Sequence, residues 1–287
     1  MIKFDTLSRF SACIATLAIL ACGLSSSAQA ASKVLILATT TSTQDSGLLE
    51  VLIPLFEKES GYIVKTIAVG SGQAMLMGKK GEVDVLLVHS PDAEIKFMAE
   101  GAGSSRRVVM HNEFVVVGPT TDPAKLRGFK TCAEAFKKIA DVKALFFFRN
   151  DNSGTYTKEK ELWKAAGVIP DSQQWYHQTG LGMGQTLLVA DEKKGYTLTD
   201  RATYIALKTK LELAIVLEGD PKLMNIYHVI QVNAVKWPKV NSAGAKTFAD
   251  FMVSPKTQKV IGSYGVVKFR APLFFPDAGK NSEDLGL

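Results

Sequence analysis

Residues 34–72 decide the fold, and they read VLILATTTSTQDSGLLEVLIPLFEKESGYIVKTIAVGSG. The stretch opens with a continuous apolar run, residues 34–38, which is typical of a strand buried on both faces of a parallel sheet. After a hydroxyl-rich segment, apolar residues recur near the helical period from Leu48 to Phe56, and Gly61 ends this predicted helix. A second β-branched run follows at residues 62–69. Strand, helix and strand in this order predict an α/β fold, an open parallel sheet with helices on its faces.

The same alternation continues along the chain and predicts two α/β lobes. A third strand is expected at residues 83–88. Two further strands, residues 108–110 and 114–117, are expected to lead into a second lobe, and residues 225–232 are expected to return from it. Two crossings leave a cleft between the lobes, and such sheets bind ligands outside the carboxyl ends of their strands. The predicted organisation is a signal peptide at 1–30, lobe I at 31–115, lobe II at 116–224, and a return segment of lobe I with C-terminal helices at 225–287.

The first thirty residues have the pattern of a secretory signal peptide. Lys3 and Arg9 precede a short apolar stretch, residues 12–24, and an A-x-A cleavage site ends the segment at Ala30. A second interpretation is a lipoprotein signal in which Cys22 is lipidated and becomes the first residue. The sequence therefore predicts an exported, periplasmic chain, with lipid anchoring at Cys22 as the alternative.

Composition excludes several classes of protein. The chain has 287 residues, of which 46% are hydrophobic and 22% charged, and this excludes a disordered or collagen-like chain. The four histidines are far apart in sequence and no CxxC spacing occurs, so a metal-cation site is not expected. The formal net charge of +6 fits either anionic ligands or an ordinary basic surface. Basic residues form no dense run with aromatic residues, so nucleic acid is not expected as a partner.

Three predicted strand-to-helix junctions share one composition. Each places Ser, Thr or Gly just before a helix, in the segments 39–43, 70–72 and 149–155. The first turn of a helix carries unpaired backbone N–H groups and the positive end of the helix dipole, so hydroxyls and glycine there can form an anion site. Helix capping alone explains any single junction, but three junctions at one cleft edge favour ligand binding. A fourth segment, residues 180–185, is either another such helix start or a tight turn.

Arg149 directly follows an apolar strand, residues 145–148, and is therefore predicted to project from a strand end into the cleft. Its planar guanidinium suits bidentate pairing with an oxyanion. Asp151 is placed to hold the guanidinium for that purpose, and a purely structural salt bridge between the two residues is the alternative. An exported enzyme that acts on phosphorylated substrates is a second functional class, but the sequence offers no GxSxG motif and no histidine cluster for it.

Five segments in order carry a family resemblance: ATTTSTQDSGLL at 38–49, VGSGQA at 69–74, DVLLVH at 84–89, RNDNSGT at 149–155 and LTDRATY at 198–204. Together they resemble the tungstate-binding proteins that serve tungstate ABC importers. The resemblance covers nearly the whole mature chain, and the Thr-Thr-Thr-Ser run is its most specific part. The R-x-D-x-S-G-T pattern is broader and is shared with phosphate-binding relatives.

The resemblance implies a type II periplasmic-binding-protein fold, with two lobes joined by two crossover segments and an oxyanion held in the cleft between them. It also implies a binding protein rather than an enzyme, no cofactor, a monomer, and the permease subunits of an ABC transporter as membrane partners. By matching motifs, the residues implied to bind the oxyanion are Thr40, Thr41, Ser42, Ser71, Arg149, Ser153, Gly154 and Thr155.

The chemistry of the ligand agrees with these residue types. Tungstate is fully deprotonated at neutral pH and only accepts hydrogen bonds, and hydroxyls, amides and one arginine offer donors. Hydrogen phosphate carries a proton and is better matched by a site with an acceptor carboxylate, whereas the third strand is followed here by His89. His89 itself is expected to support the site or the core rather than to bind the ligand. The resemblance thus implies tungstate as the ligand, and the residues leave molybdate and phosphate as alternatives.

Overall fold

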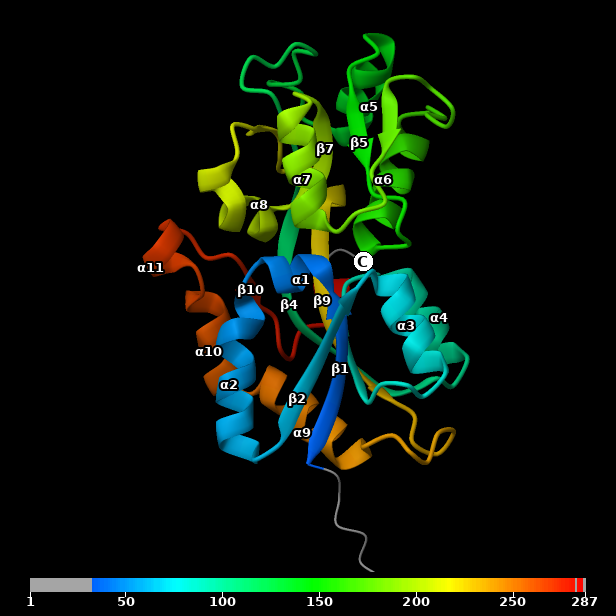
Figure 1. Cartoon of the computed structure of the whole chain (residues 1–287), viewed down its shortest axis with the longest axis vertical. Helices are drawn as coiled ribbons and strands as arrows, with labels where there is room; N and C mark the ends of the chain where they lie inside the picture. The colour runs from blue at the N-terminus through cyan, green and yellow to red at the C-terminus, as the bar shows by residue number, and fades with distance from the viewer. Residues whose placement is uncertain (1–32, 282, 286–287) are drawn as a thin grey trace, which may run out of the picture. The chain divides into compact units, whose positions relative to one another are not determined.

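The structure, a computed structural model, describes residues 33–281 and 283–285 (Figure 1). The expected signal peptide and the alternative lipidation site at Cys22 lie outside these residues. Within the described ranges, no helix has both the length and the apolar character that crossing a lipid bilayer requires.

The strands of the first group run in the order β2-β1-β3-β9-β4. β1 pairs in parallel with β2 and with β3, as the strand-helix-strand pattern predicts, and β9 joins antiparallel between β3 and β4. The short β10 adds to the other edge of β4. The bounds are β1 (Val34–Thr40), β2 (Ile63–Val69), β3 (Val85–Val88), β4 (Gly103–Gly118), β9 (Met224–Val232) and β10 (Phe275–Pro276).

The strands of the second group continue from β4 in the order β7-β5-β6. β5 pairs in parallel with β6 and β7, whereas β4 pairs antiparallel with both β7 and β8. β4 and β9 are therefore the two segments that connect the groups, and Figure 1 shows both passing between them. The bounds are β5 (Phe146–Phe148), β6 (Tyr176–Gln178), β7 (Tyr196–Asp200) and β8 (Ala214–Leu217).

Helices cover both groups of strands, and four of those described begin at the hydroxyl- and glycine-rich segments of the sequence, at Thr41, Ser71, Gly154 and Met183. The predicted helix after Gly47 runs over Leu48–Ser60 and ends at Gly61, whose left-handed backbone (φ 72°) terminates it. The first hydroxyl-rich segment, which leads to this helix, contains a short helix of its own, Thr41–Asp45. The bounds are α1 (Thr41–Asp45), α2 (Leu48–Ser60), α3 (Ser71–Lys79), α4 (Pro91–Ala99), α5 (Cys132–Asp141), α6 (Gly154–Ala165), α7 (Met183–Glu192), α8 (Arg201–Leu207), α9 (Ser242–Val253), α10 (Pro255–Ser263) and α11 (Val266–Phe269), with 3₁₀ turns η1 (Lys208–Lys210), η2 (Pro221–Leu223) and η3 (Glu283–Leu285).

The prediction of two short strands, residues 108–110 and 114–117, is wrong, because they belong to one strand of 16 residues, β4. The polar residues between them were expected to interrupt it. Instead β9 runs alongside and pairs His111 with Ile226 and Asn112 with Asn225, so the polar segment is held in the ladder. A local pattern of side chains cannot reveal such a partner, which lies more than a hundred residues away in sequence.

The buried apolar side chains gather in four sets, two around each group of strands, and the larger set of each group joins its helices to its sheet. In the first group this set includes Leu35, Leu37 and Phe248, and joins α2 and α9 to the sheet of β1. In the second group it includes Phe146 and Trp163, and joins α5 and α6 to the sheet of β5. The predicted α/β fold with two lobes is confirmed, while the boundaries 31–115, 116–224 and 225–287 stay predictions.

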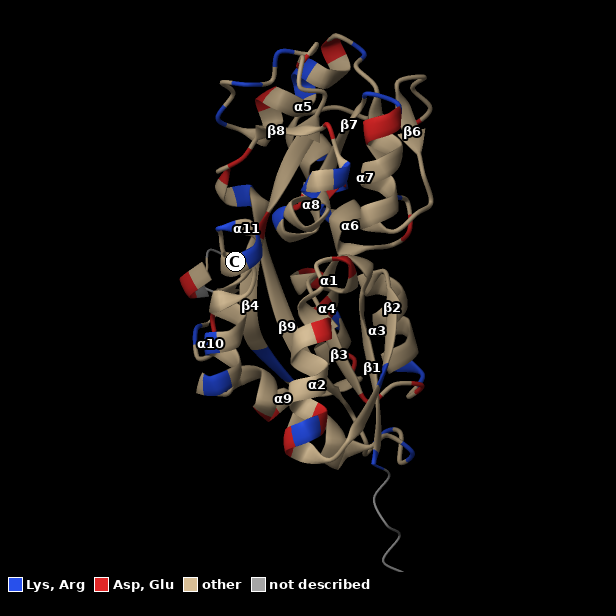
Figure 2. Ribbon diagram, turned by 60° about the vertical axis from the view of Figure 1, so that its left-hand side comes forward, with Lys and Arg blue, Asp and Glu red and all other residues tan. Residues whose placement is uncertain are grey.

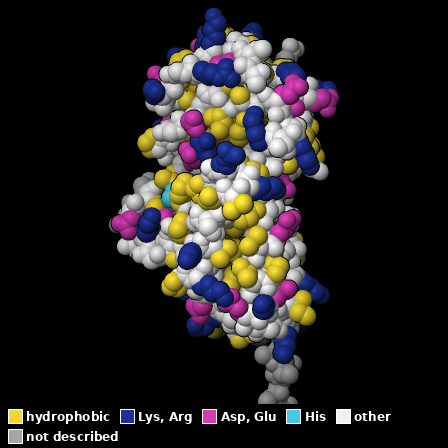
Figure 3. Space-filling view, turned by 90° about the vertical axis from the view of Figure 1, so that its left-hand side faces the viewer, with side chains coloured by type: hydrophobic (Ala, Val, Ile, Leu, Met, Phe, Trp, Pro, Cys, Tyr) yellow, Lys and Arg dark blue, Asp and Glu magenta, His cyan; other side chains and the backbone are white. Residues whose placement is uncertain are grey.

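Charged and apolar side chains are distributed differently over the surface. In Figure 2, Lys and Arg alternate with Asp and Glu on the helices of both lobes instead of forming one stripe. Figure 3 views the side that carries α2, α10 and α11 and shows apolar side chains among polar ones. Val267 on α11 is the most exposed of the large apolar residues described, at 98%, and Val51 on α2 is 39% exposed.

Glu159 on α6 is a buried carboxyl in the core of lobe II. Its Oε1 accepts hydrogen bonds from Trp163 Nε1 (2.8 Å) and from the Tyr176 hydroxyl (2.6 Å). Burial raises the pKa of Glu159 from 4.5 to about 8, against the opposing effect of these two hydrogen bonds. Between these pH values the unfolded chain loses a proton that the folded chain keeps, so the free energy of unfolding falls as the pH rises through this window.

Glu159→Gln keeps the neutral shape and removes the titration. We expect the variant to gain stability relative to the unsubstituted protein as the pH rises from 5 to 8, by up to about 1 kcal/mol per pH unit. Urea unfolding of both proteins at pH 5, 6, 7 and 8 measures this difference. A difference in unfolding free energy that stays constant over the range would contradict the assignment.

Candidate functional site

The residues expected to bind the oxyanion lie where strands end and helices begin, as predicted. They come from three junctions: β1 to α1, β2 to α3, and β5 to α6. Thr40 ends β1, Thr41 and Ser42 begin α1, Ser71 begins α3, Arg149 follows β5, Ser153 is the N-cap of α6, and Gly154 and Thr155 begin α6.

Arg149 links the two lobes. Its side chain is 3% exposed, and its Nη2 donates to Thr41 Oγ1 at 2.9 Å, across 108 residues of sequence. Its Nε donates to Asp151 Oδ2 at 3.1 Å, and Nη2 contacts the same oxygen. The predicted contact between Asp151 and the guanidinium is confirmed, while its purpose in binding an oxyanion stays a prediction. The guanidinium also reaches the hydroxyl-rich segment of lobe I, which a merely local salt bridge would not require.

Backbone of lobe I and backbone of lobe II touch at glycines in the other junctions. A methyl group on Gly70 would lie 2.8 Å from the carbonyl oxygen of Asp151, and one on Gly154 would lie 2.8 Å from the carbonyl oxygen of His89. Gly72 N–H donates to the carbonyl of Asn152 at 3.0 Å. The three junctions are therefore brought together, and only residues without a side chain fit at these contacts.

Two predicted site residues carry buried hydroxyls without a partner. Ser71 Oγ and Thr155 Oγ1 make no hydrogen bond to any described residue, and both residues are at most 2% exposed. Leaving a buried hydroxyl unpaired costs about 1–3 kcal/mol. Two such groups at adjoining junctions indicate that a ligand supplies the missing acceptors.

The hydroxyls of the first junction are, by contrast, bonded to one another. Thr40 Oγ1 lies 2.7 Å from Thr43 Oγ1 and 3.0 Å from Ser42 Oγ, and it accepts from Thr43 N–H. Ser42 Oγ lies 3.2 Å from His89 Nε2. Thr41 Oγ1 differs, since it accepts from Arg149 and, at 3.5 Å, from Met183 N–H. Its own proton is therefore available for a ligand.

Helix capping, the alternative explanation for each junction, occurs at two of the three. Thr40 caps α1 and Ser153 caps α6 by accepting from Tyr156 N–H, whereas Gly70 before α3 makes no side-chain cap. The fourth segment is a helix start: Gly182 is the N-cap of α7 and lies against Thr41.

Burial governs the titratable groups around these junctions. It lowers the pKa of His89 from 6.5 to about 4, so the ring is neutral at physiological pH. It raises the pKa of Asp200 from 3.8 to about 6, partly offset by hydrogen bonds from Thr203. Burial likewise raises the pKa of Asp45, although Gly184 N–H donates to its carboxylate.

Behind the first junction, His89 is buried as expected, but sequence reasoning missed its asparagine partners Asn112 and Asn225. His89 Nδ1 lies 2.9 Å from Asn225 Oδ1, and Asn225 Nδ2 donates to Asn112 Oδ1 at 2.7 Å. Asn112 and Asn225 are each 2% exposed. The signal was present in the sequence, because an asparagine opens the otherwise largely apolar run 225–232, but no local rule assigns it a partner.

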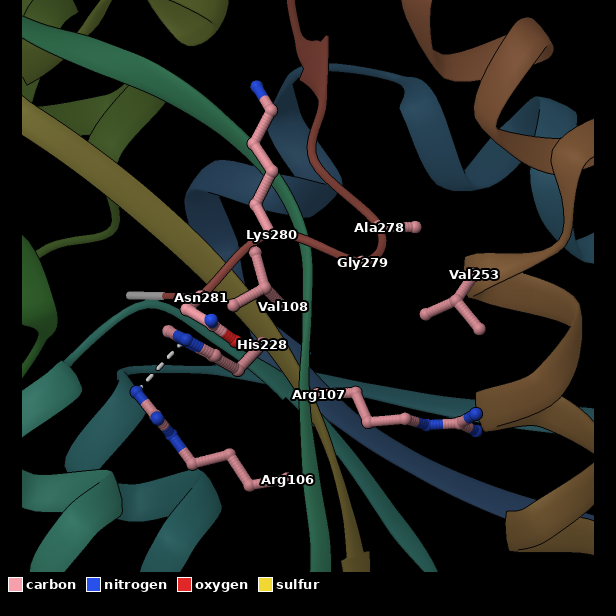
Figure 4. Close-up of a pocket in the computed structure, with 9 residues that line it drawn as sticks. All are labelled: Arg106, Arg107, Val108, His228, Val253, Ala278, Gly279, Lys280 and Asn281. Carbon is pink, nitrogen blue, oxygen red and sulfur yellow. Dashed lines mark hydrogen bonds between the residues drawn. The ribbon is translucent and has the colours of Figure 1, made fainter. Parts of the chain in front are cut away.

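A separate cavity of about 620 Å³ lies beside β4, and no predicted site residue lines it (Figure 4). Arg106, His228 and Lys280 are among its lining residues, and Arg106 and His228 both pair with the buried Glu94. Among the residues that the structure describes, no three His, Cys, Asp or Glu side chains are grouped to hold a metal ion.

Comparison with known proteins agrees with this fold. A family model described as a PBP superfamily domain matches residues 25–256. A protein named tungstate-binding protein TupA, from Peptoclostridium acidaminophilum, is 49% identical over 86% of this chain and 86% of its own length. A crystal structure titled the tungstate ABC transporter from Geobacter sulfurreducens is 48% identical over 80% of this chain and 98% of that one, with a TM-score of 0.74.

The structure of the tungstate-binding protein TupA from Desulfovibrio alaskensis G20 is 46% identical to this chain. The match covers 85% of this chain and 99% of that one, with a TM-score of 0.72. The predicted type II periplasmic-binding-protein fold is thereby confirmed. With the fold, the order of the junctions and these identities in agreement, this chain belongs to the PBP superfamily and, within it, to the family of the TupA proteins.

Proposed function

We propose that this protein binds a tetrahedral oxyanion, tungstate, between its two lobes and delivers it to an ABC-type permease. The observation that carries the proposal is the pair of buried hydroxyls without partners, Ser71 Oγ and Thr155 Oγ1, which come from opposite lobes. Tungstate offers four oxygens that only accept hydrogen bonds, so one ion can satisfy donors from both lobes. The names of the similar proteins support tungstate as that ion.

The proposed ligand residues are those expected from the sequence, and they differ in what they offer. Arg149 supplies the positive charge, and Thr41, Ser71 and Thr155 supply hydroxyl protons that no described residue accepts. The remaining members contribute backbone around the anion and keep the segments in place. These remaining members are Thr40, Ser42, Ser153 and Gly154.

Phosphate is a weaker candidate because the nearby carboxylates are occupied. Asp151 accepts from Arg149 and from Ser153 N–H, and Asp45 accepts from Gly184 N–H. The proton of hydrogen phosphate would have to compete with these protein donors for a carboxylate oxygen. Molybdate shares the charge and shape of tungstate, so the preference between them rests on the names of the similar proteins.

Delivery to a permease follows from the same proposal. Arg149 and Thr41, which bond across the lobes, are also proposed ligand residues. Closing on the anion therefore also forms the closed surface that the permease binds. We propose a periplasmic protein that acts as a monomer and is exported by its N-terminal segment, with lipid anchoring at Cys22 as the alternative. Binding rather than catalysis on a phosphorylated substrate is proposed, in keeping with the similar proteins.

Calorimetric titration of the mature protein with tungstate, molybdate, sulfate and phosphate tests the ligand. We expect saturable binding of tungstate at one site per chain, and much weaker binding of sulfate and phosphate. Phosphate binding as tight as that of tungstate, or no binding of any of the four anions, would overturn the proposal.

Substitution of Arg149 tests the charge. Arg149→Glu should abolish tungstate binding, because it removes two charge-assisted donors and brings a second negative charge to the anion. Arg149→Lys should weaken binding less, by about tenfold, since the charge survives while the fork is lost. Binding constants come from the same titration, and far-UV circular dichroism checks that each variant is folded. Undiminished binding by Arg149→Glu would mean that the site has been misplaced.

Removal of the unpaired hydroxyls should weaken tungstate binding without lowering the stability of the protein. Ser71→Ala and Thr155→Val should each weaken tungstate binding about tenfold, because each loses one donor to the anion. Without ligand, both variants should melt at or above the temperature of the unsubstituted protein, because a buried unpaired hydroxyl is gone.

A matched control is Thr197→Val, which removes a buried hydroxyl that donates to the carbonyl of Phe147 at 2.9 Å. This variant should melt at a lower temperature and bind tungstate normally. If Ser71→Ala and Thr155→Val behave like the control, their hydroxyls do not meet the ligand.

A further inference from the structure

A continuous chain of buried side-chain hydrogen bonds runs behind the site. From its far end, Asn112 Nδ2 donates to Asp200 Oδ1 (3.4 Å), and Asn225 Nδ2 donates to Asn112 Oδ1 (2.7 Å). His89 Nδ1 meets Asn225 Oδ1 at 2.9 Å, and His89 Nε2 meets Ser42 Oγ at 3.2 Å. All five residues are buried, with exposures of 4% or less. The chain therefore joins Asp200 in lobe II to Ser42 in lobe I.

The carboxylate of Asp200 sets the direction of every bond in this chain. It accepts only, so the amide nitrogen of Asn112 must face it, which turns the oxygen of Asn112 toward Asn225. The nitrogen of Asn225 then faces Asn112, and its oxygen accepts from His89 Nδ1–H. Reversing either amide would place two oxygens against each other. Since burial holds the pKa of His89 near 4, the ring is neutral, and its Nε2 is an acceptor for the Ser42 hydroxyl.

The two asparagines lie where the lobes are connected. They are directly opposed in the β4–β9 ladder. One residue further along, at Glu113 and Met224, pairing of β4 with β9 ends, and from Phe114 onward β4 pairs with β7 of lobe II. Lobe II also lies close to His89, since a methyl group on Gly154 would be 3.1 Å from His89 Nδ1.

We propose that Asn112, Asn225 and His89 are positioning residues for the oxyanion site. The amide pair at the lobe connection keeps the proton of His89 on Nδ1. Nε2 then accepts a hydrogen bond from the Ser42 hydroxyl, and this bond holds the segment 40–43 in its binding geometry. The ligand in this inference is the one given by the proposed function, on which the inference rests. The position of the proton on His89 does not depend on that function. In this arrangement the Ser42 hydroxyl donates its hydrogen bond to His89 and not to the anion.

The consequence for binding is preorganisation. Ser42 has a fixed partner in His89 and is linked through Thr40 to Thr43, so these hydroxyls need not reorient when an anion arrives. Thr41, which stands outside this chain, keeps its proton for the ligand. Without His89 Nε2 as acceptor, the Ser42 hydroxyl competes for other partners and the segment loses its single arrangement.

The test is the tautomer of His89, measured by nitrogen-15 NMR of histidine-labelled protein without ligand, with His89→Gln identifying the signal. We expect Nδ1 protonated and Nε2 unprotonated at pH 7. Asn225→Ala removes the acceptor of Nδ1–H, so His89 should shift toward the Nε2-protonated form, and tungstate binding should weaken about tenfold in calorimetry. An unsubstituted protein with Nε2 protonated would overturn the proposal.

Asn233→Ala is the matched control. Asn233 directly follows β9 and donates to the carbonyl of Gly101 at 2.9 Å, outside the chain of bonds. It should leave the His89 tautomer and tungstate binding unchanged. If the unsubstituted protein binds tungstate while Asn225→Ala alters neither tautomer nor affinity, the positioning role fails and the proposed function stands. If the unsubstituted protein binds no tungstate while the tautomer is as expected, the proposed function fails instead.

Discussion

The buried guanidinium of Arg149 is the constraint on which the site depends. A cation that is almost removed from solvent must be paired, and a single carboxylate, Asp151, pairs it within its own loop. Its Nη2 also donates across to Thr41 in the other lobe. The positive charge thus stands where the segments of both lobes meet, and a doubly negative ligand placed there would be held by the groups that also hold the lobes together.

Much of the site could be predicted from the sequence because its parts are local. Each junction is a strand end followed by Ser, Thr or Gly and a helix start, and these residue types cap helices and expose backbone N–H groups wherever they stand. Arg149 was recognisable for a similar reason, since a charged residue directly after three buried phenylalanines has only the strand end to project from. The structure shows that these junctions lie side by side, as expected for strand ends that face one cleft.

What the sequence could not show are pairings over long distances. β4 was expected as two strands because His111, Asn112 and Glu113 are polar. It is one strand because β9, which follows lobe II in the sequence, pairs with these three residues. The chain from Asp200 to Ser42 is of the same kind, with partners drawn from β7, β4, β9 and the loop after β3. A polar residue in a strand signals that some partner exists, but only the tertiary fold determines which one it is.

The glycines at the lobe contacts have a consequence for how closely the two lobes can approach. At Gly70 and Gly154 even the smallest side chain would strike backbone of the opposite lobe. An alanine at either position would keep the two lobes from meeting, but it would leave each lobe folded and its core intact. The space at these two positions is thus limited by the meeting of the two lobes rather than by the packing inside either one.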